Sequence, residues 1–198
     1  MCEKLLLSLQ KEKKHYGQII SWQQRDCRTS RHTYLPKNRP NMKNIYFPDE
    51  DITENDLFFV CSMIERVARH IKQRNKYVVN RIGYDNLLRQ LSIADTLHSE
   101  NPRQVVDDWI DEYQLENGNF DITDVDKELC TNIPTPLDMG KVYTRLILQT
   151  RLDAEDYAKG IIRVYNDDIC ETLDNYNCSA YYEPSYFIAR SYFAGGFM

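Results

Sequence analysis

Three residues that could cleave or modify RNA occupy two successive turns of one amphipathic stretch. Arg66 and His70 are four residues apart, and Glu65 and Arg69 repeat that spacing, so both pairs are neighbours on a helix surface. A histidine can transfer a proton near neutral pH while an arginine holds a phosphate group. One interpretation is therefore a small ribonuclease or nucleotide-modifying toxin with Arg66, Arg69 and His70 at its active site. The interpretation we favour is a solvated helix face whose basic end compensates the helix dipole.

The arrangement of Arg66 and His70 resembles the Arg-His motif of the HEPN ribonucleases, in which four to six residues separate the pair, whereas three separate them here. This resemblance implies RNA cleavage, with His70 as acid or base and arginine on the phosphate.

Other catalytic patterns are incomplete or missing in the sequence. Asp95 and His98 have a spacing that can share a metal, with Glu100 just beyond, but no second acid–histidine pair completes a two-metal helical site. The sequence contains neither a phosphate-binding glycine loop, nor a dinucleotide fingerprint, nor a nucleophile elbow around a serine. We therefore expect no metal and no cofactor, and we favour a protein without enzymatic activity.

The C-terminal third is rich in tyrosine and phenylalanine, and the charges beside these residues are acidic. Tyrosine offers a large contact area with a polar tip, which suits protein interfaces. We expect a partner-binding surface with aromatic anchors and a charged rim, although core filling explains the same aromatic residues equally well. The predicted anchors are Tyr181, Tyr182, Tyr186 and Tyr192, and the predicted rim is Asp167, Asp168 and Glu171.

Charge divides the chain into two parts. Residues 1–41 hold nine Lys or Arg against three Asp or Glu, whereas residues 42–198 hold 16 against 27, a net charge of −11. An acidic body repels nucleic acid and favours a basic protein partner. Three interpretations of residues 1–41 stay open. The segment is an ordered element packed on the acidic body, it is a tail that touches nucleic acid or membrane, or it results from a wrongly assigned start codon, since Met42 directly precedes the domain. A DNA-binding function would use Arg25, Arg28, Arg31, Lys37 and Arg39.

Apolar periodicity and capping residues predict the elements that position these side chains. We expect helices over residues 54–74, 84–98 and 102–115, another that Asp138 caps, one over 152–175, and one from Pro184 to the Gly195–Gly196 pair. Residues 77–79 fit a strand or a helix entrance, residues 45–48 an apolar anchor, and residues 116–136 a loop that Phe120 and Ile122 hold. The fold class is therefore all-α: a compact bundle of about six helices over residues 45–198, preceded by a basic arm over residues 1–44.

A glycine early in the fourth helix, Gly140, indicates close approach by another helix. The segment from Pro136 to Ile147, together with Asp95 to Asn101, resembles uncharacterised small bacterial proteins encoded near toxin–antitoxin genes. The resemblance covers residues 54–150 and implies no residue roles.

Six cysteines without metal or disulfide spacing, and no signal or membrane segment, favour a cytoplasmic protein with reduced thiols. The function that we expect is protein–protein interaction, as an antitoxin or accessory component that binds a basic partner.

Overall fold

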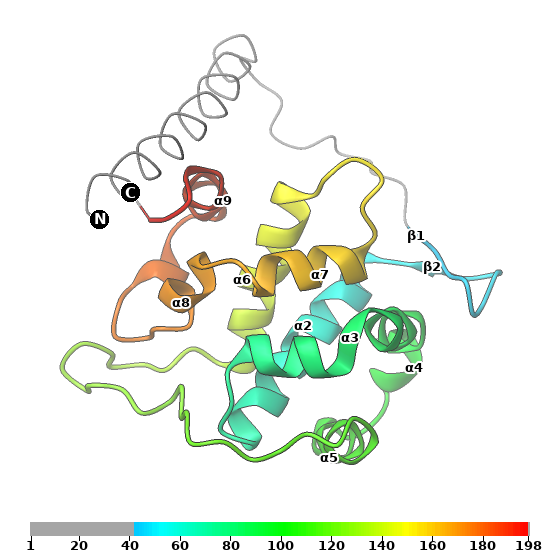
Figure 1. Ribbon diagram of the computed structural model, residues 1–198, viewed down its shortest axis with the longest axis horizontal. Helices are drawn as coiled ribbons and strands as arrows, with labels where there is room; N and C mark the ends of the chain where they lie inside the picture. The colour runs from blue at the N-terminus through cyan, green and yellow to red at the C-terminus, as the bar shows by residue number, and fades with distance from the viewer. Residues whose placement is uncertain (1–41, 198) are drawn as a thin grey trace, which may run out of the picture. The chain divides into compact units, whose positions relative to one another are not determined.

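The computed structural model describes residues 42–197, and their regular structure is helical apart from one pair of two-residue strands (Figure 1). The all-α prediction is confirmed. The predicted basic arm lies outside the described residues, except for residues 42–44. The elements in chain order are β1 (Met42–Lys43), β2 (Asp51–Ile52), α2 (Glu54–His70), α3 (Asn75–Ser92), α4 (Ala94–Leu97), α5 (Pro102–Glu112), α6 (Pro136–Thr150), α7 (Tyr157–Tyr165), α8 (Ile169–Leu173), the short 3-10 helix η1 (Ala180–Tyr182) and α9 (Ser185–Ala194).

Residues 42–44, which the sequence assigned to the arm, belong to the folded body. Met42 lies opposite Ile52 in the antiparallel β1–β2 pair, and the Met42 Sδ accepts a hydrogen bond from the Tyr157 N–H at 2.9 Å. The side-chain amide of Asn44 donates to the Ser92 carbonyl at 2.9 Å. The folded body therefore includes three residues that the composition assigned to the basic arm.

The predicted apolar anchor at residues 45–48 is wrong. These residues form the connection between β1 and β2, and Ile45 is 65% exposed, with Tyr46 and Phe47 also exposed. The Asn44 side-chain oxygen accepts hydrogen bonds from the Tyr46 and Phe47 N–H groups, so a polar turn sets this conformation instead of apolar burial.

Helix α2 is buried along most of its length and begins at a capping box. The Thr53 hydroxyl accepts from the Asp56 N–H, and the Asp56 carboxylate accepts from the Thr53 N–H at 2.7 Å. The helix ends at His70 instead of residue 74, because Lys72 takes a left-handed conformation with φ +54°. The predicted start is confirmed, and the basic last turn is shorter than expected.

The crossing of α2 and α6 explains the glycine early in α6. A β-carbon on Gly140 would overlap the Ser62 hydroxyl of α2, so only glycine allows the two backbones this close. The predicted helix–helix crossing is confirmed.

Gly83 interrupts α3 directly before the start of the predicted helix over residues 84–98. Its φ of +74° and ψ of 172° are non-helical, so α3 consists of two helical segments on either side of it. Residues 77–79 are helical, which settles the choice between strand and helix entrance. The segment after Gly83 ends at Ser92, and the separate turn α4 covers the rest of the predicted 84–98 helix.

Helix α3 contacts both ends of α7. Near the C-terminus of α7, Asn80 and Asn166 exchange two side-chain hydrogen bonds of 2.9 Å. At the other end, the Tyr84 hydroxyl donates to Asp156, whose carboxylate also caps α7 by accepting from the Lys159 N–H. These contacts join residues on opposite sides of the Gly83 break.

Capping residues explain why the start of α5 was predicted correctly and why the cap of α6 was assigned to the wrong residue. Asn101 caps α5 and Pro102 opens it, as predicted. Helix α6 is capped by Thr135 and not by Asp138. Asp138 is the third helical residue, and its carboxylate completes a capping box by accepting from the Thr135 N–H at 3.0 Å.

The predicted long helix over 152–175 is wrong, because the chain breaks it twice. Residues 151–156 form a loop that Asp156 ends by capping α7, and a turn at 166–168 separates α7 from α8. The Asp167 side chain accepts from the Ile169 N–H in that turn at 3.0 Å. Aspartate and asparagine bond to nearby backbone groups, and this competes with helix continuation. The predicted last helix is confirmed as α9, with Gly195 in the left-handed conformation at its end.

The long loop between α5 and α6 is held against the end of α2. The Gly118 N–H donates to the Ile71 carbonyl at 2.7 Å, and the Phe120 N–H donates to the Lys72 carbonyl at 2.9 Å. Ile122 is buried and the Arg74 guanidinium lies over the Phe120 ring, so both predicted contacts of the loop are confirmed.

Candidate functional site

The four tyrosines predicted as anchors have different surroundings. Tyr182 and Tyr186 are 70% and 51% exposed, whereas Tyr181 is only 8% exposed and packs edge-on against Tyr176. The Tyr192 hydroxyl accepts a hydrogen bond from Arg163 at 2.8 Å. Two of the predicted anchors are therefore available at the surface, and Tyr181 and Tyr192 are engaged inside the fold.

The three acidic residues predicted as a rim lie at the α7–α8 junction. Asp168 and Glu171 are exposed, and Asp167 is committed to the turn through the Ile169 N–H. The exposed tyrosines lie further along the chain, in η1 and α9. The acidic rim and the exposed anchors thus come from separate segments.

A cavity of about 300 Å³ lies beside Tyr182, between α6, η1 and α9. Tyr181, Leu146 and Ile188 are among its apolar lining, and all three are buried. Charged side chains from α6 and from the residue after η1 also line it: Asp138, Lys141, Arg145 and Glu183. The sequence predicted no cavity here, although Lys141 and Arg145, exposed and four residues apart, mark the face of α6 that borders it.

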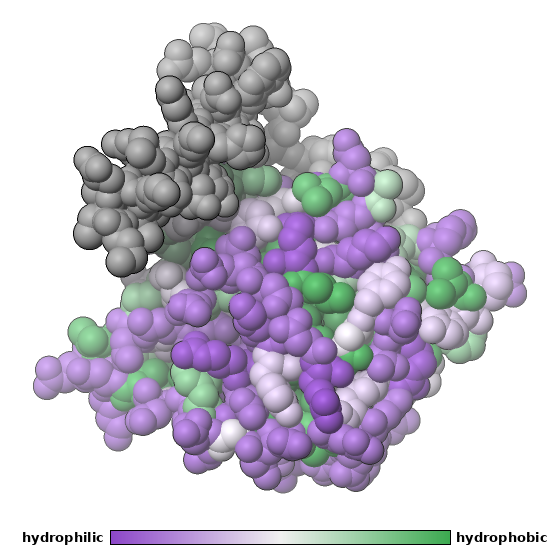
Figure 2. Space-filling model, viewed as in Figure 1, coloured by the Kyte–Doolittle hydropathy of each residue, from purple (hydrophilic) through white to green (hydrophobic). Residues whose placement is uncertain are grey.

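The region also presents exposed aromatic residues on α9. Phe193 is 55% exposed and follows Tyr186 by seven residues, which is two helical turns and therefore one face. The visible face of the molecule is mainly hydrophilic, with small groups of apolar residues (Figure 2). We name Tyr182, Tyr186 and Phe193, which are all exposed, the aromatic surface.

The candidate ribonuclease residues line a second cavity, of about 610 Å³. Arg66, Arg69 and His70 come from the end of α2, and Arg103 comes from the beginning of α5. Arg69 is already engaged: it donates to Glu65 at 2.7 Å, to the Pro134 carbonyl at 2.9 Å and to the Tyr176 hydroxyl at 3.0 Å. Arg66 and His70 remain open to a ligand, whereas Arg69 holds the fold together.

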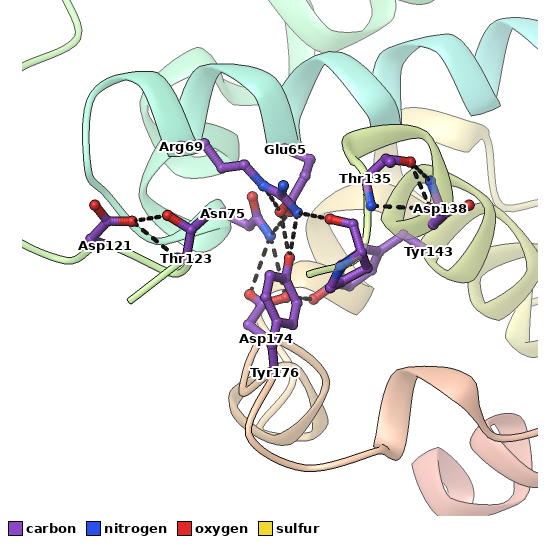
Figure 3. Close-up of polar contacts among 11 residues, drawn as sticks. Glu65, Arg69, Asn75, Asp121, Thr123, Thr135, Asp138, Tyr143, Asp174 and Tyr176 are labelled. Atoms are coloured by element: carbon purple, nitrogen blue, oxygen red, sulfur yellow. Dashed lines mark hydrogen bonds and ion pairs between the residues drawn. The ribbon is translucent and has the colours of Figure 1, made fainter. Parts of the chain in front are cut away.

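Behind Arg69 lies a buried polar cluster that joins α2, α3, α6 and the segment after α8 (Figure 3). Asn75 bridges two carboxylates, donating to Glu65 at 2.6 Å and to both Asp174 oxygens at 3.2 and 3.3 Å. The Tyr143 hydroxyl donates to Asp174 and the Tyr176 hydroxyl donates to Glu65, each at 2.5 Å. We call these residues, with Arg69, the Asp174 cluster.

The Asp174 cluster concentrates two carboxylates away from water. Burial and the neighbouring Glu65 raise the pKa of Asp174 to about 8, against the hydrogen bonds from Tyr143 and Asn75. Burial and Asp174 also raise the pKa of Tyr143 far above its usual range. Asp174 therefore holds its proton at neutral pH. The cluster connects helices inside the fold, and neither Glu65 nor Asp174 lines either of the two cavities. The spacing of Glu65 and Arg69 predicted that they are neighbours on a helix, but nothing in the sequence linked Glu65 to Asp174.

A second cluster of the same residue types connects the α6–α7 loop to α9. Arg163 donates to both Glu155 oxygens at 2.7 and 2.8 Å, and to the Tyr192 hydroxyl at 2.8 Å. Burial raises the pKa of Glu155, but the hydrogen bonds from Arg163 and the Leu152 N–H outweigh burial and bring the pKa below its usual value. We call these residues the Glu155 cluster.

The acid–histidine pair near α4 has a structural role. The His98 ring stacks on Phe59 with 4.4 Å between ring centroids, and Asp95 is exposed. Among residues 42–197, no group of three or more His, Cys, Asp or Glu side chains is placed to hold a metal ion.

The four cysteines of the described segment are free thiols, and Cys61, Cys130 and Cys170 are buried. Burial raises the pKa of the Cys61 thiol to about 12, so this group is inert at neutral pH.

The chain was compared with protein-family models, curated proteins and solved structures, and none of them matches. None of the helices between residues 42 and 197 is both long enough and apolar enough to cross a membrane.

Proposed function

We propose that this protein is a protein-binding module and that its contact site is the aromatic surface with the adjoining 300 Å³ cavity. One observation carries the proposal: Tyr182, Tyr186 and Phe193 are each more than half exposed within a stretch of twelve residues. Aromatic residues are enriched at protein interfaces relative to the rest of the surface. Tyr182 itself lines the cavity, which joins the two features.

The cavity lining indicates how a partner would be held. An apolar side chain of the partner fits the buried floor of Leu146 and Ile188, while Lys141 and Glu183 offer charges of both signs at its edge. Burial of the aromatic anchors supplies affinity, and the charged edge supplies orientation. The net charge of −11 over residues 42–198 attracts a basic partner from a distance. We infer from this an antitoxin-like or accessory role, in the cytoplasm, where free thiols persist.

The test is a binding titration of the full chain with each protein encoded beside its gene. We expect a complex with one of them, and we expect Tyr182→Ala to weaken it about tenfold or more, as truncation of an interface anchor does. The matched control is Tyr46→Ala, which removes an exposed tyrosine from the β1–β2 connection. Binding that responds equally to both substitutions, or no complex with any of these proteins at micromolar concentration, would contradict the proposal.

A further inference from the structure

The 610 Å³ cavity collects cationic side chains from two helices that the sequence does not connect. Helix α2 contributes Arg66 and His70 in its last turns, and α5 contributes Arg103 in its first turn. Asp107 is the acidic residue in the lining. The cavity is therefore basic although the body around it carries a net charge of −11.

These three side chains have no partner in the described part of the chain. Between residues 42 and 197, the side chains of Arg66, His70 and Arg103 make no hydrogen bond and no ion pair, whereas the neighbouring Arg69 makes three hydrogen bonds. Two unpaired guanidinium groups that face the same cavity repel each other, and a bound anion removes that repulsion. Arg103 is exposed and Arg66 is half-buried, so both guanidinium groups are accessible to such an anion.

Helix ends add to the preference for an anion. Helices α5 and α6 both begin at this cavity, with Pro102 and Pro136 in its lining. The Asn101 side chain and the Thr135–Asp138 capping box already accept from N–H groups at these two ends, so the helices contribute the field of their dipoles and not direct N–H donors. Helix α2 ends there, and Arg69 and His70 offset the partial negative charge of its C-terminus.

The size and walls of the cavity indicate more than a simple anion. Its volume is in the range of small-molecule sites, and Pro102, Val106 and Pro136 provide apolar surface beside the cations. We propose that the cavity binds a nucleotide-sized organic phosphate. Arg66 and Arg103 hold the phosphate oxygens, His70 hydrogen-bonds to them, and the apolar residues contact the organic part. This site is separate from the proposed protein-binding surface and does not depend on it.

The experiment is calorimetric titration of the full chain with AMP, inorganic phosphate and adenosine at low salt. We expect saturable binding of AMP, with adenosine at least about tenfold weaker because it lacks the charged group. Arg66→Gln and Arg103→Gln should each weaken AMP about tenfold. The matched control is Arg81→Gln, an exposed arginine of α3 that does not line the cavity, and it should leave AMP binding unchanged.

Each remaining outcome decides the question. Inorganic phosphate binding as tightly as AMP supports the phosphate site but makes a free anion its ligand. Arg103→Glu replaces a positive charge in the cavity with a negative one, and glutamate is favoured in the first turn of a helix, so α5 should stay folded. This variant must therefore weaken AMP binding more than Arg103→Gln does. Unfolding curves check that the variants are folded. No saturable binding of AMP or phosphate at millimolar concentration, or binding that ignores all three substitutions, overturns the inference.

Discussion

The Asp174 cluster and the Glu155 cluster contain the same residue types in different charge ratios. In the Glu155 cluster, one arginine pairs with one carboxylate through two hydrogen bonds, and the pKa of Glu155 lies below its usual value. In the Asp174 cluster, Arg69 bonds to Glu65 while Asp174 receives only neutral donors, Tyr143 and Asn75. Its pKa rises accordingly. A buried carboxylate is therefore charged or neutral according to whether a cation bonds to it directly.

Removing the arginine from each cluster should cause the largest loss in the free energy of unfolding and show the clearest difference between the two clusters. Arg69→Leu leaves Glu65 and Asp174 buried together without a bonded cation, and we expect a loss of about 3–5 kcal/mol in the free energy of unfolding. Arg163→Leu leaves Glu155 with the Leu152 N–H, and we expect a loss of about 2 kcal/mol. Urea unfolding at pH 7 measures both, and equal losses would remove the distinction between the clusters.

The pH dependence of stability should differ in sign between the clusters. Asp174 keeps its proton in the folded state up to a pKa of about 8, whereas an unfolded aspartate releases it near 3.8. The folded state therefore binds more protons between these values. Stability should fall as pH rises through this window, by up to about 1.4 kcal/mol per pH unit from this group. The stabilising contribution of Glu155 is instead lost at acid pH, as its carboxylate is protonated.

Two neutral substitutions check that dependence. Asp174→Asn should flatten the decline in unfolding free energy between pH 5 and pH 8, because the group that titrates is gone. Glu155→Gln should leave the slope in that range unchanged and alter it only below about pH 4.5. Urea titrations at several pH values distinguish these results, and a steep decline that survives Asp174→Asn would assign the proton to another group.

Deleting one tyrosine hydroxyl from each cluster should give the smallest effects. Tyr143 is fully buried, and Tyr143→Phe removes a donor from Asp174, so we expect a loss of about 2 kcal/mol. Tyr192 is half-buried, and Arg163 keeps its other partners in Tyr192→Phe, so the loss should be about 0.5–1 kcal/mol. Chemical unfolding at pH 6, where Asp174 is protonated, compares the two, and a larger loss for Tyr192→Phe would reverse the expected order.

Signals local in sequence were the ones that could be predicted. The cap at Asn101–Pro102 and the break at Gly83 depend on one or two residues, and both occur where the sequence placed them. The break after α7 was missed because the apolar pattern from Val164 to Ile169 continues across the turn at 166–168, where the Asp167 side chain accepts from the Ile169 N–H. Nothing in a helical period indicates whether a helix will continue past such a residue.

The candidate sites were less predictable than the helices, because they join distant segments. Tyr181 and Tyr182 are adjacent and identical in type, yet one is buried and the other is exposed, since the short helix η1 turns them to different sides. Arg103 joins Arg66 and His70 only through the packing of α5 beside the end of α2. Residue type and spacing identified individual side chains but not the groups that they form.

Two contacts between α3 and α7 constrain the length of α7. Asn80 and Tyr84 meet α7 near its two ends, at Asn166 and Asp156. One residue inserted into α7 would advance one end by about 1.5 Å and rotate it by more than a quarter turn, so only one of the two contacts could persist. The number of residues in α7 is thus constrained from outside the helix, by two side chains of α3.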